Sequence, residues 1–409
     1  MRAKWSSLTF IKWTVATVAL FLLLPDTWAK PKFKVLANVP GGLWSGLTMD
    51  AKGNLYGVTS GGGDYGEGSV FELSRGANGK WTVTTLHSFD GTDGSSPTGS
   101  LVFDAAGNLY GTAPDGGAYL YGDVFELSSG SGGWTFNVIY DFCQQFDCPD
   151  GADPVGLLVD RLGHLYGTAS MGIYDSGVVY ELTNSGSGWG QSVLYTFDGL
   201  KTGMDPGGPL VFDAARRIYG ATWTGGPYGG SGTVFRLSHR PGGAWKQHAL
   251  YDFCKKGWPC VDGFRPEGGL VLDGTAKIYG ATAQGGSHTC GETNCGTVFG
   301  LSQTGSGPWK EAVLYDFRPG GTGNGPSGGV VLDKKGNLYG TAVNGGSGGC
   351  GYGCGVVYKL TPLGQNKWQY SVVHAFTGQD GGNPQGGLIF DKNGSLYGTA
   401  LSTAWEITP

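Results

Sequence analysis

Residues 157–169 read LLVDRLGHLYGTA, two short apolar stretches around a tight turn, and this pattern recurs along the chain. Seven copies share an L/I-Y-G core, whose tyrosines are Tyr56, Tyr110, Tyr166, Tyr219, Tyr279, Tyr339 and Tyr397. Successive tyrosines are 53 to 60 residues apart, and a period of about 50 residues indicates a propeller or another array of small supersecondary units. One such unit cannot bury its own apolar face, so the copies must stack on one another.

Each copy predicts four short strands joined by turns. In the third copy the strands are expected at residues 157–159, 165–169, 178–182 and 189–197, separated by turns rich in Gly, Asn and Ser. A tryptophan opens the fourth strand in six copies. A residue that recurs at the same place in successive copies has a structural role in the repeat. We therefore expect this tryptophan to pack between neighbouring copies.

The two ends of the chain predict a closed ring. The seventh copy ends at Pro409 without a fourth strand, and residues 33–37 supply a spare one before the first copy. Pairing of residues 33–37 with 404–407 would close the circle and leave only short, protected strand edges. We therefore predict an all-β, seven-bladed β-propeller of four-stranded antiparallel blades. It would be one domain over residues 30–409, with the N-terminal strand completing the last blade.

Residues 1–29 have the pattern of a signal peptide. Arg2, Lys4 and Lys12 are followed by an apolar run at 13–24 and by Ala29 at the expected cleavage position. The run of 12 residues is shorter than the roughly 20 needed to cross a bilayer. We expect an exported protein, periplasmic or extracellular, with no membrane span after cleavage.

Eight cysteines form four local pairs, and an even number in an exported chain predicts disulfides. Their spacings do not match C-x2-C zinc sites, and no histidine accompanies them. The expected bridges would stiffen loops rather than hold the fold together. They are Cys143/Cys148, Cys254/Cys260, Cys290/Cys295 and Cys350/Cys354.

The composition excludes several classes of protein. The chain of 409 residues has 80 Gly, 13% aromatic residues, 14% charged residues and a formal net charge of −5. The aromatic content argues against disorder. Without basic runs there is no electrostatic footprint for nucleic acid or an anionic membrane. We expect a monomer that binds a glycan or protein ligand and no nucleic acid.

Residues 99–117 and 328–346 show most fully the motif G-G-L-x-x-D-x-x-G-N-L-Y-G-T-A-x-x-G-G. This motif, followed by V-F-E-L, resembles the GloVer tandem repeat of exported bacterial proteins. The resemblance covers nearly the whole chain after the signal segment. It implies an exported tandem-repeat protein, and it brings no established activity and no known catalytic residue.

The long connections are expected on one face of the ring. They join the second strand to the third and each copy to the next, and they carry all four cysteine pairs. Binding commonly resides on loops that a rigid scaffold holds. Polar groups beside exposed aromatic rings suit sugar or peptide recognition, although turn positions also favour such polar residues. The candidate ligand-binding residues are Asp115, Trp223, Thr224, Gln284 and Asn344.

Acidic residues recur in the long loops. They could bind calcium, but Asx-turns explain them equally well, so we expect no metal and no cofactor, with calcium as the alternative. No G-x-S-x-G, H-E-x-x-H or P-loop motif occurs, and no catalytic residue is assigned. The recurring residues are Asp93, Asp150, Asp153, Asp205, Asp262 and Asp380.

Three functions remain open at this stage. The preferred prediction is an exported, non-enzymatic binding scaffold that recognises glycan or protein through its loop-rich face. The alternative is a carbohydrate-active enzyme, a glycoside hydrolase or polysaccharide lyase, with acidic residues at the channel mouth. A purely structural envelope protein is the third, and it predicts no pocket.

Overall fold

The structure is a computed structural model that describes residues 31–409 except 241, 275–276, 292, 347 and 365. The predicted signal peptide, residues 1–29, lies outside the described residues. The described part of the chain forms β-strands joined by turns and loops, and its helical structure is a 3₁₀ turn, η1 (Ile173–Asp175). It contains no helix long and apolar enough to cross a membrane.

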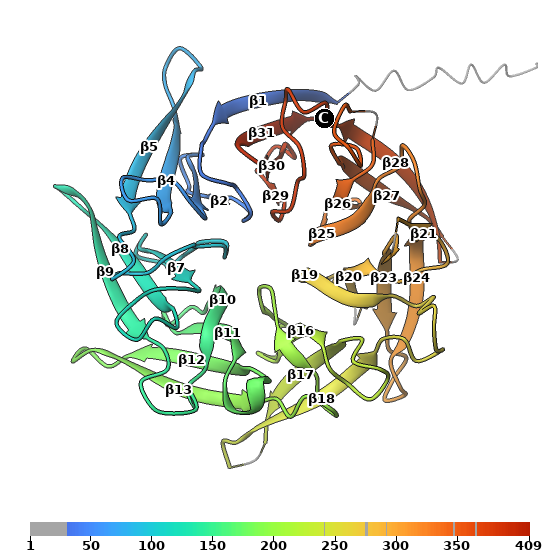
Figure 1. Cartoon of the computed structure of the whole chain (residues 1–409), viewed down its shortest axis with the longest axis horizontal. Coiled ribbons are helices and arrows are strands. Elements are labelled where there is room, and N and C mark those ends of the chain that lie inside the picture. The colour runs from blue at the N-terminus through green and yellow to red at the C-terminus, as the bar shows by residue number, and fades with distance from the viewer. Residues whose placement is uncertain (1–30, 241, 275–276, 292, 347, 365) are drawn as a thin grey trace, which may run out of the picture. The chain divides into compact units, whose positions relative to one another are not determined.

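The strands form antiparallel sheets of four, one for each sequence repeat, in a propeller-like arrangement (Figure 1). The first repeat forms β2 (Thr48–Met49), β3 (Leu55–Thr59), β4 (Ser69–Arg75) and β5 (Trp81–Ser88). The second forms β6 (Val102–Phe103), β7 (Leu109–Ala113), β8 (Asp123–Gly130) and β9 (Gly133–Asp141). The third forms β10 (Ala152–Val159), β11 (Leu165–Met171), β12 (Val178–Asn184) and β13 (Trp189–Thr196).

The fourth repeat has a first strand in two pieces, β14 and β15, which both pair with β16. Its strands are β14 (Met204–Pro206), β15 (Val211–Phe212), β16 (Ile218–Thr224), β17 (Thr233–His239) and β18 (Trp245–Asp252). The fifth repeat forms β19 (Phe264–Leu272), β20 (Lys277–Gln284), β23 (Thr297–Ser302) and β24 (Lys310–Asp316). A small hairpin, β21 (Thr289–Cys290) and β22 (Thr293–Asn294), lies in its loop.

The sixth repeat forms β25 (Asn324–Leu332), β26 (Leu338–Asn344), β27 (Val356–Gly364) and β28 (Lys367–Ala375). A parallel pairing of Gly269 with Gly329 joins it to the fifth repeat as one eight-stranded sheet. The seventh forms β29 (Ile389–Phe390), β30 (Leu396–Ala400) and β31 (Thr403–Thr408). Its fourth strand is β1 (Lys32–Asn38), which runs antiparallel to β31 with Lys34 opposite Glu406.

The aspartate of each L-V-x-D motif builds the turn between the first two strands. Asp104 Oδ1 accepts hydrogen bonds from the backbone N–H of Ala106 (2.9 Å) and of Asn108 (2.8 Å). Its other oxygen accepts from the hydroxyl of Tyr110 at 3.2 Å. The same turn forms at Asp50, Asp213 and Asp333. The repeated aspartate and tyrosine are therefore structural.

Each buried cluster lies between two successive repeats. Tyr56 of the first repeat packs edge-on against Phe103 and Trp134 of the second, with ring centroids 5.2 and 5.8 Å apart. Tyr110 and Trp189 repeat this contact at 5.8 Å. The tryptophan that opens the fourth strand therefore packs between repeats, as expected. Because the apolar faces are shared, no repeat has a core of its own.

A glycine–proline contact also recurs between repeats. The glycine before the third strand has a positive φ and packs on the proline that begins the next repeat, so a Cβ there would lie 2.4 to 2.6 Å from the proline Cδ. Only glycine fits because both the left-handed backbone and the close approach exclude a side chain. The pairs are Gly68/Pro97, Gly122/Pro154, Gly177/Pro206, Gly232/Pro266, Gly296/Pro326 and Gly355/Pro384.

Two glycines with nearly the same φ separate the effect of the left-handed backbone from that of the close contact. Gly177 (φ +82°) would place a Cβ 2.4 Å from Pro206 Cδ, whereas Gly186 (φ +83°) has nothing within 4 Å. We predict that Gly186→Ala costs about 1 kcal/mol of stability, the cost of a left-handed alanine. Gly177→Ala should cost about 2 kcal/mol more, because the added methyl overpacks the interface. Urea unfolding of both variants measures the difference, and equal losses would show that the contact between repeats contributes nothing.

Candidate functional site

The residue before each of these prolines, called here the rim position, has an unusual backbone. Its φ lies between +48° and +63° in six repeats, although four different non-glycine residue types occupy it. Such values are uncommon outside glycine, and strained backbone of this kind gathers at functional sites. The rim residues are Ser96, Asp153, Asp205, Arg265, Gly325 and Asn383.

A backbone hydrogen bond holds the rim position in place. The N–H of Asp153 donates to the carbonyl of Tyr121 at 3.0 Å, and that of Arg265 to the carbonyl of Ser231 at 3.0 Å. In each case the acceptor belongs to the loop of the preceding repeat. Since the main chain makes this bond, the side chain at the rim is free to vary.

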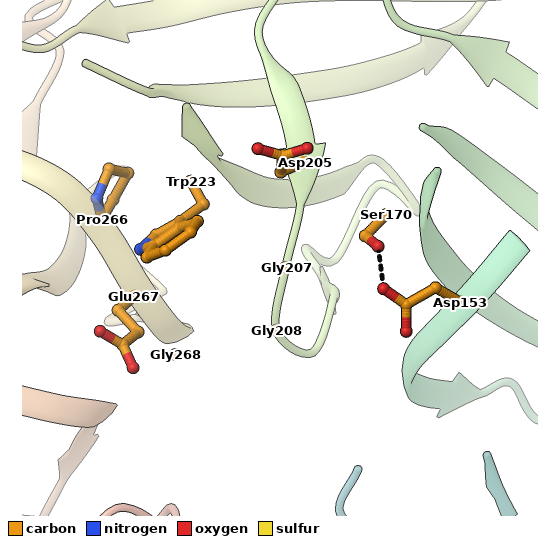
Figure 2. Close-up of a pocket in the computed structure, with 9 residues that line it drawn as sticks. All are labelled: Asp153, Ser170, Asp205, Gly207, Gly208, Trp223, Pro266, Glu267 and Gly268. Atoms are coloured by element: carbon orange, nitrogen blue, oxygen red, sulfur yellow. Dashed lines mark hydrogen bonds between the residues drawn. The ribbon is translucent and has the colours of Figure 1, made fainter. Parts of the chain in front are cut away.

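A pocket of about 370 Å³ opens beside three consecutive rim positions, in repeats three, four and five. Its volume is within the range of small-molecule sites. Figure 2 shows the carboxylates of three residues around it, with the ring of Trp223 beside them. The lining residues are Asp153, Ser170, Asp205, Gly207, Gly208, Trp223, Pro266, Glu267 and Gly268.

Each pocket carboxylate is held by one hydroxyl group. Ser170 Oγ donates to Asp153 Oδ2, and Thr224 Oγ1 donates to Asp205 Oδ2 at 2.5 Å. Ser327 Oγ donates to Glu267 Oε1 at 3.0 Å. The described residues offer no hydrogen bond to the second oxygen of either aspartate, which leaves that oxygen for a ligand.

Burial raises the pKa of Asp153, and the negative charges of Asp115 and Asp205 raise it further, against the opposing hydrogen bond from Ser170. Burial likewise raises the pKa of Glu267, although the hydrogen bond from Ser327 and the charge of Arg265 act in the other direction. A raised pKa suits a carboxyl group to act as a general acid.

Trp223 and Arg265 form one side of the site. Trp223 is 40% exposed although it lies within strand β16, one residue before its end. The guanidinium carbon of Arg265 lies 4.5 Å from the centre of the Trp223 ring and 5.2 Å from that of Phe264. These are cation–π distances, and they hold the guanidinium against the aromatic wall.

The structure places the five candidate ligand-binding residues differently. Trp223 lines the pocket, and Thr224 lies behind it as the hydrogen-bond donor to Asp205. Asp115 is exposed, pairs with Ser95 and reaches the pocket only through its charge. Gln284 and Asn344 do not line the pocket; they pair in their sheets with the residues directly before the rim positions of repeats five and six.

The sequence carried a signal for the residues that were missed. Asp153 and Asp205 were noted only as acidic loop residues, and Ser170 and Glu267 were not considered. The rim position varies in residue type while the proline after it stays fixed. Thr224 was selected because its position varies between repeats while the residues beside it stay fixed. The same criterion, applied to the rim position, would have found both aspartates.

The acidic loop residues considered as calcium ligands accept hydrogen bonds from protein groups. His87 Nε2 lies 2.7 Å from Asp93, and the hydroxyl of Tyr140 donates to Asp150 at 2.8 Å. The hydroxyl of Tyr251 likewise donates to Asp262 at 2.7 Å. Within the described ranges, no group of three or more His, Cys, Asp or Glu side chains could hold a metal.

The cysteines form the four local disulfides expected from the sequence, all in the long connections. Disulfides are typical of proteins that fold in oxidising compartments, so they indicate an exported protein. The bridges are Cys143–Cys148, Cys254–Cys260, Cys290–Cys295 and Cys350–Cys354.

These features define an all-β tandem-repeat protein with a propeller-like fold and an acidic pocket lined by the first and second strands of its repeats. The Gloeobacter/Verrucomicrobia repeat matches residues 27–215 and 168–404. The chain therefore belongs to the Gloeobacter/Verrucomicrobia repeat family, which confirms the resemblance drawn from its motifs. No curated protein matches the chain.

Solved structures share the fold at low sequence identity, which shows the fold alone. The match with an ancestral GH74 enzyme covers 90% of this chain and 48% of the enzyme's chain, with a TM-score of 0.60 and 12% sequence identity. The match with a protein provisionally assigned as a 6-phosphogluconolactonase from Bacteroides uniformis covers 87% of this chain and 89% of that protein's chain, with a TM-score of 0.55 and 15% sequence identity. The match with the extracellular domain of a protein provisionally assigned as a hybrid two-component system from B. thetaiotaomicron covers 92% of this chain and 39% of that chain, with a TM-score of 0.56 and 11% sequence identity.

The functional prediction from the sequence needs correction. Two of these similar folds bear the names of enzymes, and the pocket gathers carboxylates from consecutive repeats. The prediction of a non-enzymatic binding scaffold is therefore wrong. The alternative, a carbohydrate-active enzyme with acidic residues at the channel mouth, agrees better with these findings, and a purely structural protein would need no such pocket.

The raised pKa of Asp153 predicts how its removal changes stability with pH. A carboxyl group whose pKa is raised by folding costs stability once it ionises, so the cost begins above its unfolded pKa of about 3.9 and is complete above its folded pKa. Asp153→Asn keeps an acceptor for Ser170 and removes this cost. We expect the variant to gain stability over the wild type between pH 3 and pH 7, measured by urea unfolding. A difference that does not change with pH would contradict the raised pKa.

Proposed function

We propose that the protein is a carbohydrate-active enzyme of the glycoside hydrolase type, with its active site in the rim pocket. The observation that carries the proposal is the pair Asp153 and Asp205. They occupy the same rim position in consecutive repeats, line one pocket and interact electrostatically. Glycoside hydrolysis in most families needs two such carboxyl groups on either side of the scissile bond.

The environments of the two aspartates assign their roles. Asp153, whose pKa is raised by burial and by its acidic neighbours, is the general acid that protonates the leaving oxygen. Asp205, fixed by Thr224, is the carboxylate that activates water or attacks the sugar carbon. A carboxyl group with a raised pKa is suited to the acid task of such a pair.

Exposed aromatic rings support a carbohydrate substrate. Among the described residues, the exposed large aromatic side chains lie in the connections that lead to the third strand or to the next repeat, except for Trp223, which lies in β16 and lines the pocket. Flat apolar rings give sugars a stacking surface, and nearby polar groups give direction. The residues are Trp44, Tyr65, Tyr119, Tyr121, Phe146, Trp223, Tyr228, Trp258 and Tyr352.

We also propose that the sheets form a closed, seven-bladed ring. Three contacts between the seventh and first repeats support closure. β1 pairs with β31, and the N–H of Val39 donates to the carbonyl of Ser402 at 2.7 Å, as rim residues do elsewhere. Tyr397 also shares a buried cluster with Leu43 and Leu55 of the first repeat. In this proposal the enzyme acts as a monomer on a glycan in the periplasm or outside the cell.

Loss of either aspartate tests the proposed activity. We expect Asp153→Asn and Asp205→Asn each to lower the release of reducing ends from the polysaccharide that the wild type cleaves by about 100-fold or more, the usual contribution of a general acid or base. Asp90→Asn, an exposed carboxylate outside the pocket, is the control and should leave the rate unchanged. Full activity in the Asp153→Asn/Asp205→Asn double variant would refute the assignment, and unsaturated products would indicate a lyase instead.

A cross-link tests the closure. Lys34 and Glu406 face each other in the β1–β31 pairing, within reach of a disulfide, which needs Cα atoms about 4.4–6.8 Å apart. Lys34→Cys with Glu406→Cys should therefore form a bridge that links the two ends of the chain. It would be detected as a gel shift that reductant reverses and that Lys34→Cys alone does not show. Failure of the oxidised double variant to cross-link would argue against the ring.

A further inference from the structure

A basic side chain that the proposed hydrolysis does not use lies beside the pocket, next to Pro266 and against Trp223. Arg265 occupies the rim position of repeat five, the same position as Asp153 and Asp205 in the two repeats before it. We propose that Arg265 recognises an acidic group on the substrate, an inference that rests on the proposed function. The enzyme would then act on a polysaccharide with anionic sugar units, whose charge comes from a carboxylate or a sulfate ester.

The backbone of Arg265 is the first observation. Its φ is +59°, a conformation that arginine rarely adopts. The bond from its N–H to the carbonyl of Ser231 and the packing of Pro266 against Gly232 hold it there. The fold needs only the main chain and the proline at this point, because glycine, serine and asparagine serve in other repeats. The arginine side chain is therefore unexplained by the fold.

The surroundings of the guanidinium are the second observation. Its carbon lies 4.5 Å from the centre of the Trp223 ring, and Trp223 lines the pocket. Its Nε is buried and has no hydrogen-bond partner among the described residues. Arg265 is in none of the ion pairs that the described residues form. A buried charged donor without a partner is costly. An oxyanion of a ligand would satisfy it, and the planar guanidinium has the paired donors that carboxylate and sulfate accept.

The charge of the pocket is the third observation. Asp153, Asp205 and Glu267 line it, and no lysine or arginine is among its lining residues. These carboxylates would repel an anionic sugar unless a positive charge lay beside them. Arg265 supplies that charge next to Glu267. Burial raises the pKa of Glu267, and the charge of Arg265 opposes this larger effect by lowering the pKa. The acidic group would thus lie toward repeat five, which leaves the scissile bond near the aspartates of repeats three and four.

The test compares acidic and neutral forms of one substrate. Oligogalacturonate, its carboxyl-reduced neutral counterpart and a sulfated galactan oligosaccharide are offered to the wild type and to Arg265→Gln. We expect the wild type to prefer one acidic form, and Arg265→Gln to lose about 10- to 100-fold in kcat/KM on that form, as a charged hydrogen bond contributes. The rate on the neutral form should not change. Which acidic form is preferred distinguishes carboxylate from sulfate.

Two further variants separate recognition from folding. Arg265→Lys keeps the charge and loses the paired donors, so it should fall between the wild type and Arg265→Gln. Arg240→Gln removes the same charge from an exposed turn and should behave as the wild type. Equal loss on acidic and neutral forms, or no preference in the wild type, would overturn the assignment.

Direct binding keeps this inference separate from the proposed catalysis. If no oligosaccharide is cleaved, the proposed hydrolysis fails, but calorimetric titration of the same three oligosaccharides still tests Arg265. Tighter binding of an acidic form, lost in Arg265→Gln, would support acidic-sugar recognition without turnover. Absence of any difference between acidic and neutral forms in both rate and affinity would reject it.

Discussion

The contact between the glycine before each third strand and the proline of the next repeat constrains the rest of the structure. A Cβ on any of these six glycines would come within 2.6 Å of a proline carbon, so two successive sheets approach as closely as backbone allows. The same approach brings the residue before the proline within hydrogen-bond reach of the preceding loop. The shared apolar clusters, the left-handed rim backbone and the pocket all depend on that spacing.

The sequence predicted the fold well because its signals are local and repeated. The L-Y-G cores, the aspartate turns and the fourth-strand tryptophans each report on a few neighbouring residues, and the recurrence of the pattern removes ambiguity. The four-stranded antiparallel sheets and the tryptophans between repeats follow from such signals. The two-piece first strand of repeat four, β14 and β15, had no local signal and was not predicted.

The site was harder to predict because its parts are brought together only by the stacking of repeats. Asp153 and Asp205 are more than fifty residues apart along the chain, and only the approach of repeats three and four makes them neighbours. In the sequence, each aspartate taken alone is explained as a residue of an Asx-turn. Neither was therefore assigned a function. Trp223 was selected as an aromatic ring of a long loop, and it lines the pocket. Gln284 and Asn344 were selected by their spacing from the repeated tyrosine, and that spacing places them in sheet pairs away from the pocket lining.

The main-chain bond at the rim position has a consequence for the history of such proteins. Because the fold uses only the N–H of this residue, serine, aspartate, arginine, asparagine and glycine all occupy it within one chain. A single base change in one repeat can therefore alter the charge around the pocket without disturbing the neighbouring repeats. Substitution at these positions alone could change the substrate, whereas substitution of the glycines would disturb the contacts that join the repeats.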